Sequence, residues 1–237
     1  MQQQSRYSGI LNEQIDIALK AYPHYKKLRK ELAKIYQDYE VTDGFSRAAE
    51  IGCGSGATTK YVLKKASLEL PMRVLFALDN DIKMLNCLEK KIGWKEGLVL
   101  LHFDAYHWLS NGKESTLDTI YSSWVLHNFD KDYLNKVLST SYRKLKPWGV
   151  FISLDKIGLD DKVKDEELFQ NQISRINKKL SGYPELRDAL IKHEYEDMTP
   201  EFIMRESETL EQLRRIGFRN CRIVKRIERD AILVAEK

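Results

Sequence analysis

Three glycines lie close together in the segment AAEIGCGSGATTKYV, residues 48–62, at Gly52, Gly54 and Gly56. An apolar run precedes them and a helical pattern follows, so they mark the end of a strand and the start of a helix. Glycine lets the backbone turn sharply and approach a ligand, and the following helix presents free N–H groups. Glu50 stands just before the first glycine. Its carboxylate suits a cationic ligand better than the pyrophosphate of a dinucleotide.

Acidic residues also stand at the ends of the next two apolar runs. Asp79 follows the second run, where an acid can accept hydrogen bonds from ribose hydroxyls. Asp104 follows the third run and would point into the crevice where open α/β sheets bind ligands. The alternative for Asp104 is the cap of a turn, and the alternative for Asp81 is a helix N-cap. Acids after three successive runs, Glu50 included, favour a ligand site at one edge of a sheet.

A histidine stands in the segment SWVLHNF, residues 123–129, directly after a fourth apolar run. His127 would lie at the same crevice, and histidine titrates near neutral pH, so it is a candidate general base. The alternative is that its ring only hydrogen-bonds the loop backbone. The histidines and cysteines show no zinc-type or H-x-x-x-H spacing, so we expect no metal site.

Aromatic and histidine side chains in the flanking segments could close over a ligand. Tyr7, Tyr22 and Tyr25 lie in the N-terminal helical region, and His24 and His193 lie in segments that could form a lid. The alternative for Tyr22 is packing in the core of an amphipathic helix. The Lys/Arg runs at 26–30 and 214–226 contain acids and apolar positions, and we expect them to be solvated faces.

Alternating strands and helices must position these residues. The apolar runs are short and nearly continuous, as in a parallel sheet covered by helices on both faces. A terminal pair of runs joined by a tight turn at 228–230 predicts a hairpin with an antiparallel strand. The expected strands are 48–51, 73–78, 98–103, 117–123, 150–154, 222–227 and 231–235, and the expected helices between them are 58–66, 81–92, 133–145 and 209–216.

Two further helical regions flank this core. Residues 11–40 have one apolar stripe and are divided by Pro23. Residues 160–206 are polar and helical, with a break at Gly182-Tyr183-Pro184 and a helix start expected at Thr199-Pro200. We expect one domain, 1–237, made of an N-terminal helical cap (1–45), a ligand-binding core (46–155), a helical insertion (156–206), and a last helix with the hairpin (207–237).

Composition narrows the class of protein. The 237 residues are 43% hydrophobic and 31% charged, which is typical of a globular chain, and no run is long enough to span a membrane. The net charge of +4 is too small to indicate nucleic acid without a basic patch. Three widely spaced cysteines, Cys53, Cys87 and Cys221, form no disulfide framework, so we expect a cytoplasmic protein.

These motifs together resemble the class I S-adenosylmethionine-dependent methyltransferases. EIGCGSG at 50–56 is similar to the first motif of that family, and ALDND at 77–81, with Met84 following, is similar to the second. LDTIYSS at 117–123 and LKPWGV at 145–150 are similar to its fourth-strand and fifth-strand motifs. The resemblance implies a Rossmann-like seven-stranded sheet with an antiparallel last strand, an N-terminal helical cap and a helical insertion after the fifth strand.

The resemblance also implies the cofactor and its binding residues. S-adenosylmethionine would lie across the carboxyl ends of the first strands, with its ribose at Asp79, its adenine at Asp104 and Ala105, and its methionine part at the glycine loop. The expected cofactor-binding residues are Glu50, Gly52, Cys53, Gly54, Gly56, Asp79, Asn80, Met84, Asp104, Ala105 and Ser123. The expected activity is methyl transfer to an oxygen or nitrogen of a small molecule, with S-adenosylhomocysteine as product and His127 as candidate base.

A narrower resemblance points to bacterial carboxy-S-adenosylmethionine synthases, which modify the cofactor itself for use in tRNA modification. It rests on the opening segment AYPHY, residues 21–25, and on the insertion 165–183 that ends in Gly182-Tyr183. Those enzymes hold the added carboxylate with an arginine that is missing here, where Arg187 or Arg205 could take its place. A nicotinamide-dependent oxidoreductase and a binding module without activity are further alternatives, and a homodimer remains open.

Overall fold

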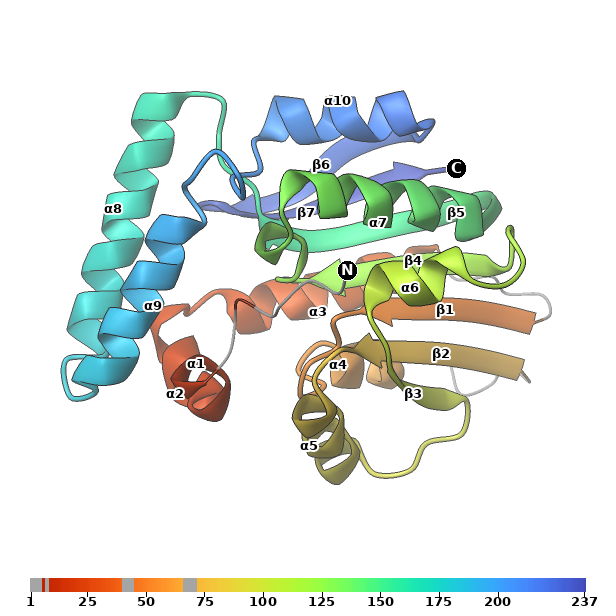
Figure 1. Ribbon diagram of the computed structural model, residues 1–237, viewed down its shortest axis with the longest axis horizontal. Helices are drawn as coiled ribbons and strands as arrows, with labels where there is room; N and C mark the ends of the chain where they lie inside the picture. The colour runs from red at the N-terminus through yellow and green to blue at the C-terminus, as the bar shows by residue number, and fades with distance from the viewer. Residues whose placement is uncertain (1–5, 7–8, 40–44, 66–71) are drawn as a thin grey trace.

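The computed structural model describes residue 6 and residues 9–39, 45–65 and 72–237. Its strands form one seven-stranded sheet in the order β3-β2-β1-β4-β5-β7-β6 (Figure 1). Strands β1 to β5 are parallel, and β7 is antiparallel to both β5 and β6. The predicted fold class is therefore confirmed. The strands are β1 Phe45–Ile51, β2 Met72–Asp79, β3 Leu98–His102, β4 Leu117–Ser123, β5 Leu145–Lys156, β6 Arg219–Ile227 and β7 Asp230–Glu236.

Helices connect the strands and form the two flanking regions. Asp81, Asp104, Asp130 and Asp161 each accept a hydrogen bond from a backbone N–H of the helix that they precede. The α-helices are α1 Ile10–Glu13, α2 Ile15–Ala18, α3 Tyr25–Asp38, α4 Thr59–Lys65, α5 Ile82–Ile92, α6 Ala105–Ser110, α7 Lys131–Lys144, α8 Lys162–Lys179, α9 Pro184–Glu196 and α10 Glu206–Ile216, with 3₁₀ turns at Leu19–Ala21 and Leu126–Asn128.

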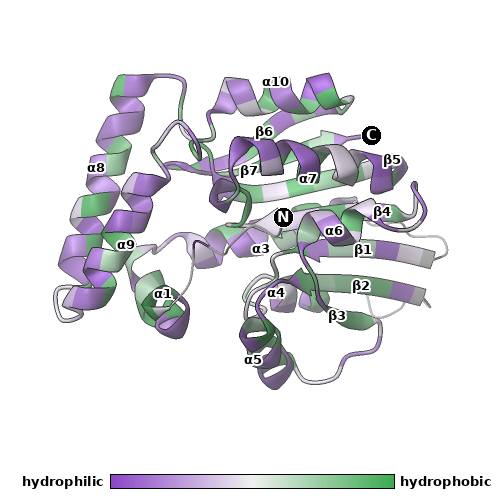
Figure 2. Ribbon diagram, in the orientation of Figure 1, coloured by the Kyte–Doolittle hydropathy of each residue, from purple (hydrophilic) through white to green (hydrophobic). Residues whose placement is uncertain are grey.

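Each face of the sheet has its own buried core. Because side chains alternate along a strand, neighbouring residues of β4 enter different cores. Ile120 packs in one cluster with Leu138 of α7, and Tyr121 packs in the other with Leu32 of α3. Figure 2 shows the hydrophobic colour concentrated on the inner strands, whereas β6 at the edge of the sheet is largely hydrophilic. Charged side chains on an edge strand discourage pairing with another chain.

The N-terminal segment packs against the insertion that follows β5. Helices α8 and α9 lie side by side at one end of the sheet, next to α1 and α2 (Figure 1). A third buried cluster joins these elements, with Ala18, Ala21 and Tyr22 on the N-terminal side and Phe169 and Leu190 on the insertion. The cap and the insertion therefore form one wall at the carboxyl ends of the parallel strands.

The predicted helices and strands are present with small changes at their ends, and one expectation was wrong. Thr199-Pro200 begins no helix, because the chain there turns back so that Met204 and Glu206 hydrogen-bond Gly158. Strand β5 bulges near its start, where Trp148 has a φ of 69° and Trp148 and Gly149 exchange backbone hydrogen bonds with Lys237. The short helix α6 was not predicted.

Within the described part of the chain, no helix is both long and apolar enough to cross a membrane.

Candidate active site

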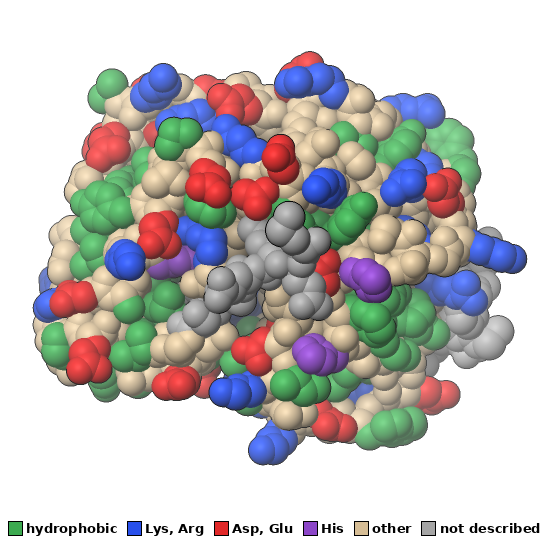
Figure 3. Space-filling view, in the orientation of Figure 1, with side chains coloured by type: hydrophobic (Ala, Val, Ile, Leu, Met, Phe, Trp, Pro, Cys, Tyr) green, Lys and Arg blue, Asp and Glu red, His purple; other side chains and the backbone are tan. Residues whose placement is uncertain are grey.

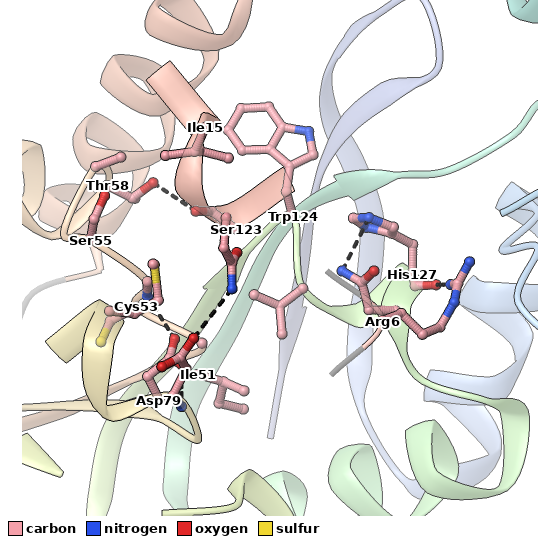
Figure 4. Close-up of a pocket in the computed structure, with 18 of the residues that line it drawn as sticks. Arg6, Ile15, Ile51, Cys53, Ser55, Thr58, Asp79, Ser123, Trp124 and His127 are labelled. Carbon is pink, nitrogen blue, oxygen red and sulfur yellow. Dashed lines mark hydrogen bonds between the residues drawn. The ribbon is translucent and has the colours of Figure 1, made fainter. Parts of the chain in front are cut away.

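A cavity of about 250 Å³ opens at the carboxyl ends of the parallel strands. Its lining combines the glycine loop, the acids that follow β2 and β3, the turn after β4, and the wall made by the cap and the insertion. Figure 4 shows Cys53 and Asp79 toward one end of this cavity, and Arg6 and His127 toward the other. The expected residues that line it are Gly52, Cys53, Gly54, Asp79, Asn80, Met84, Asp104, Ala105, Ser123, Tyr22, Tyr25 and His127.

The glycine loop has a backbone that other residues adopt only with strain. Gly52, Gly54 and Gly56 have φ angles of 64°, 51° and 78°. A methyl group at Gly52 would lie 2.5 Å from Cγ2 of Val125, and one at Gly56 would lie 2.8 Å from Cγ of Leu88. A methyl group at Gly54 would meet no heavy atom within 4 Å. Gly52 and Gly56 are thus required for packing, and Gly54 lies beside open space in the cavity.

Asp79 holds the glycine loop against the end of β2. Its Oδ2 accepts a hydrogen bond from the Gly54 N–H at 2.8 Å, and its Oδ1 accepts one from the Asp81 N–H at 2.9 Å. Burial raises the pKa of Asp79, and the two N–H groups partly oppose that rise. The carboxylate therefore supports the loop through these two hydrogen bonds.

Glu50 does not line the cavity, although it stands beside the loop. Its side chain is buried, and Oε2 accepts hydrogen bonds from Thr59 at 2.6 Å and from Tyr121 at 2.9 Å. Burial raises its pKa to about 7. Glu50 thus connects β1 to α4 and β4. Gly56 is also absent from the lining, because it packs against α5.

The acid that follows β3 is held in place from two sides. Asp104 begins α6, where its Oδ1 accepts a hydrogen bond from the His107 N–H at 2.9 Å. Its Oδ2 accepts one from the Tyr133 hydroxyl at 2.7 Å. Ser123 at the end of β4 shares a 2.6 Å hydrogen bond with Thr58, which is drawn in Figure 4. Both side chains are therefore fixed at the rim of the cavity.

His127 is oriented by an acid that the sequence reasoning missed. Its Nδ1 makes a very short hydrogen bond with Oδ1 of Asp155, near the end of β5. The other Asp155 oxygen accepts the N–H groups of Leu126 at 2.8 Å and of Val125 at 3.2 Å. Asp155 is fully buried, so the turn and the ring are held by one charged group. The signal available in the sequence was an acid at the carboxyl end of a fifth strand.

A network of buried charges adjoins His127. The ammonium of Lys156 lies 2.7 Å from Oε1 of Glu194 and 2.7 Å from Oδ2 of Asp197. Burial disfavours this ammonium, but the two carboxylates outweigh it and raise the pKa of Lys156. Arg6 lies 3.0 Å from the other Asp197 oxygen. The network ties the insertion and the N-terminal segment to the end of β5.

His127, His193 and Asp197 also place one candidate ligand atom each within 4.8 Å of one another. The sequence spacing did not indicate this arrangement, since the residues come from two elements far apart in the chain. Oδ2 of Asp197 is at the same time bonded to the Lys156 ammonium, which would repel a cation. Burial lowers the pKa of His193 to about 3, so its ring is uncharged at neutral pH.

The remaining lid expectations have mixed outcomes. Tyr22 and Tyr25 line the cavity, and the Tyr22 hydroxyl donates a very short hydrogen bond to Glu194. His193 is buried behind the cavity lining. Arg205 does not line the cavity, and its guanidinium donates a hydrogen bond to the Leu159 carbonyl at 2.8 Å. Arg187 pairs with its neighbour in the chain and does not line the cavity. Tyr7 falls outside the described residues.

Comparisons with known proteins show which proteins this chain is similar to. Residues 49–153 match the family model described as a methyltransferase domain. A carboxy-S-adenosyl-L-methionine synthase from Colwellia psychrerythraea is 25% identical over 73% of this chain and 68% of its own. Among solved structures, a possible exported protein from Bordetella parapertussis has a TM-score of 0.65 at 15% identity, covering 89% of this chain and 67% of its own. A SAM-dependent methyltransferase from Archaeoglobus fulgidus has a TM-score of 0.60 at 16% identity, covering 90% and 94%.

The sheet order, the glycine loop and the domain match over residues 49–153 are typical of class I S-adenosylmethionine-dependent methyltransferases. The chain therefore contains a methyltransferase domain, and S-adenosylmethionine is its cofactor.

Proposed function

We propose that this methyltransferase transfers the methyl group of S-adenosylmethionine to an oxygen or nitrogen of a small molecule, with His127 as general base. The observation that carries the proposal is the position of His127. Its ring lines the same cavity as Gly54 and Asp79, and its Nδ1 is held by Asp155. A base is needed when the acceptor keeps its proton at neutral pH, as a phenol or an ammonium group does.

The cofactor would extend along the row of strand ends. We assign the ribose to Asp79 and the adenine to Asp104 and Ala105, with Asn80 and Met84 beside them. The methionine part would lie along Gly52 and Gly54 toward Ser123. Support comes from the family resemblance together with the common cavity that these residues line. Glu50 would act indirectly, through β1 and the loop that follows it.

For methyl transfer from a sulfonium, the protein needs to align the donor with the acceptor and to supply a proton acceptor. A methyl sulfonium is already an activated electrophile, so orientation in a closed site can supply several kcal/mol of the barrier. Asp155 accepts a hydrogen bond from the Nδ1–H of His127, so Nε2, which lies 3.2 Å from Nδ2 of Asn128, is the ring nitrogen that would take the proton of the acceptor. Imidazolium formed in this way is stabilised by the Asp155 carboxylate.

The acceptor would enter from the side of the cap and the insertion. Tyr22, Tyr25, Leu190 and Glu194 line the cavity there. A cavity of about 250 Å³ suits a small molecule better than a polymer. On the face seen in Figure 3, the described basic and acidic side chains are intermixed. We therefore propose one domain that acts on small molecules and not on nucleic acid.

The test uses His127→Gln and a screen of phenol and amine acceptors. Wild-type protein should release S-adenosylhomocysteine only when a suitable acceptor is present. His127→Gln should lower turnover about 10²-fold to 10⁴-fold, the range of general base catalysis. Its affinity for S-adenosylhomocysteine should stay unchanged, which controls for folding. Full activity in the variant would remove His127 from the mechanism.

A second candidate, suggested by one relative, is a carboxy-S-adenosylmethionine synthase. The observation that favours it is the similarity to such an enzyme over 73% of the chain. The two arginines considered as carboxylate ligands, Arg187 and Arg205, do not line the cavity. Mass spectrometry of cofactor released from the purified protein separates the candidates, because a carboxylated species would support the synthase.

Location and assembly are further proposals. The three cysteines, Cys53, Cys87 and Cys221, are unpaired thiols in the structure, which supports a reducing cytoplasm. A fractionation experiment would test this location. A homodimer remains a proposal that light scattering of the purified protein would test.

A further inference from the structure

Arg29 is a cationic side chain that lines the cavity and stacks on aromatic rings. It belongs to α3, within the basic run at 26–30 that the sequence suggested to be solvated. Its guanidinium carbon lies 4.9 Å from the ring centre of Trp124 and 5.4 Å from that of Tyr25. These two rings stack on each other at 3.7 Å. The guanidinium is therefore held at the cavity wall by cation–π contacts.

Arg29 differs from the other basic residues that line the cavity, because those residues form ion pairs with acidic side chains. Arg6 pairs with Asp197, and Lys156 pairs with Glu194 and Asp197. Throughout the described ranges, Arg29 has no ion pair within 4 Å and no side-chain hydrogen bond, and its Nε is buried without an acceptor. Burial lowers the pKa of Arg29, and the charges of Glu50 and Asp16 partly oppose that fall.

Arg29 is partly buried, and a partly desolvated charge without a partner is costly, so such a group is expected where a ligand supplies the partner. Phosphate is disfavoured, because Glu50 and Asp16 are the acids whose charges act on Arg29, and a dianion would be repelled more than a monoanion. The planar fork of a guanidinium matches a carboxylate, which accepts two parallel hydrogen bonds. The missing partner is thus best supplied by a monoanionic carboxylate.

The position of Arg29 indicates which carboxylates can reach it. Trp124, on which it stacks, directly follows Ser123 at the end of β4. In the sheet order, β4 lies on one side of β1, whereas β2 and β3, with Asp79 and Asp104, lie on the other. A cofactor with its adenosine part at those acids would extend its amino-acid end toward Arg29. The acceptor side of the cavity, with Tyr25, adjoins the same guanidinium.

We propose that Arg29 is the carboxylate-binding residue of this cavity, presented by Tyr25 and Trp124. The carboxylate is either the α-carboxylate of S-adenosylmethionine or one carried by the acceptor. The first source rests on the cofactor placement proposed above, and neither depends on His127 acting as a base. Arg29 thereby makes the site selective for an amino-acid-bearing cofactor or for acidic acceptors.

The experiment compares ligands with and without the carboxylate. Wild-type protein, Arg29→Met, Arg29→Lys and the matched control Lys27→Met on the exposed side of α3 are titrated calorimetrically with S-adenosylhomocysteine and with 5′-methylthioadenosine. The second ligand lacks the amino-acid part and also reports folding of each variant. Benzoate is then titrated onto protein saturated with S-adenosylhomocysteine.

If the cofactor supplies the carboxylate, Arg29→Met weakens the binding of S-adenosylhomocysteine at least about 30-fold. This is the lower end of the effect of breaking a desolvated charge pair. Arg29→Lys has an intermediate affinity for S-adenosylhomocysteine. The affinity of each Arg29 variant for methylthioadenosine is unchanged, and Lys27→Met binds both ligands as wild type does. If the acceptor supplies it, S-adenosylhomocysteine is unaffected and the benzoate binding seen in wild type is lost. Equal weakening of both nucleosides, or no effect on any ligand, overturns the proposal. The activity of His127 variants tests only the proposed base. A His127 variant that is inactive but still binds methylthioadenosine therefore leaves the Arg29 proposal unchanged.

Discussion

Replacing Gly52 by alanine tests the geometry of the glycine loop most quantitatively. Gly52 has a φ of 64°, and an added methyl group would lie 2.5 Å from Cγ2 of Val125. The left-handed backbone costs an alanine about 1–2 kcal/mol, and overpacking a tight contact costs about 1–3 kcal/mol. Gly52→Ala should therefore lower the free energy of unfolding by about 2–5 kcal/mol.

A matched control and a double mutant separate the two contributions. Gly54 has a φ of 51° and open space around it, so Gly54→Ala should show the backbone cost alone, about 1–2 kcal/mol. In a Val125→Ala background, Gly52→Ala should cost about as little as Gly54→Ala, because the contact has been removed. Urea unfolding of the four proteins and wild type gives these free energies. Equal costs of Gly52→Ala in both backgrounds would refute the role given to Val125.

Three further changes test the surroundings of the site. Asp155→Asn should lower turnover about 10²-fold or more without weakening S-adenosylhomocysteine, and kinetics with calorimetry would check this. Lys156→Met removes the ammonium that Glu194 and Asp197 share and leaves Asp197 with Arg6, so unfolding in urea should show a loss of about 3–5 kcal/mol. Glu50 has a pKa raised to about 7, so the folded state holds a proton that the unfolded state has lost, and stability falls as pH rises through this window. Glu50→Gln lacks that titration, so its stability relative to wild type should rise by up to about 3 kcal/mol between pH 4.5 and 8.

The features that the sequence predicted are those encoded by neighbouring residues. The glycine loop, the acids at the strand ends and the terminal hairpin each need only a few consecutive positions, and the structure contains all three. Thr199-Pro200 satisfied a local rule for a helix start but forms a turn. The chain there must return to β5, where Gly158 hydrogen-bonds both Met204 and Glu206. Tertiary contacts override a capping signal in that situation.

The missed features depend on contacts between distant segments. Asp155 holds His127 across 28 positions, and no local pattern marks that pair. Arg29 stands in a basic run, and its place at the cavity wall depends on how α3 packs and on where Trp124 lies after β4. Helix α6 has six residues, too few to show an apolar period. The sequence therefore predicted most of the residues that line the cavity at the strand ends, whereas it did not predict the group that orients His127.

The most direct test of the proposed function follows the methyl group itself. Purified protein is incubated with trideuteromethyl-labelled S-adenosylmethionine and the acceptors from the phenol and amine screen, and the products are analysed by mass spectrometry. Methyl transfer predicts a trideuteromethylated acceptor formed in step with S-adenosylhomocysteine, and its loss in His127→Gln. An unmodified acceptor pool together with carboxylated cofactor that keeps its labelled methyl group would contradict the proposal.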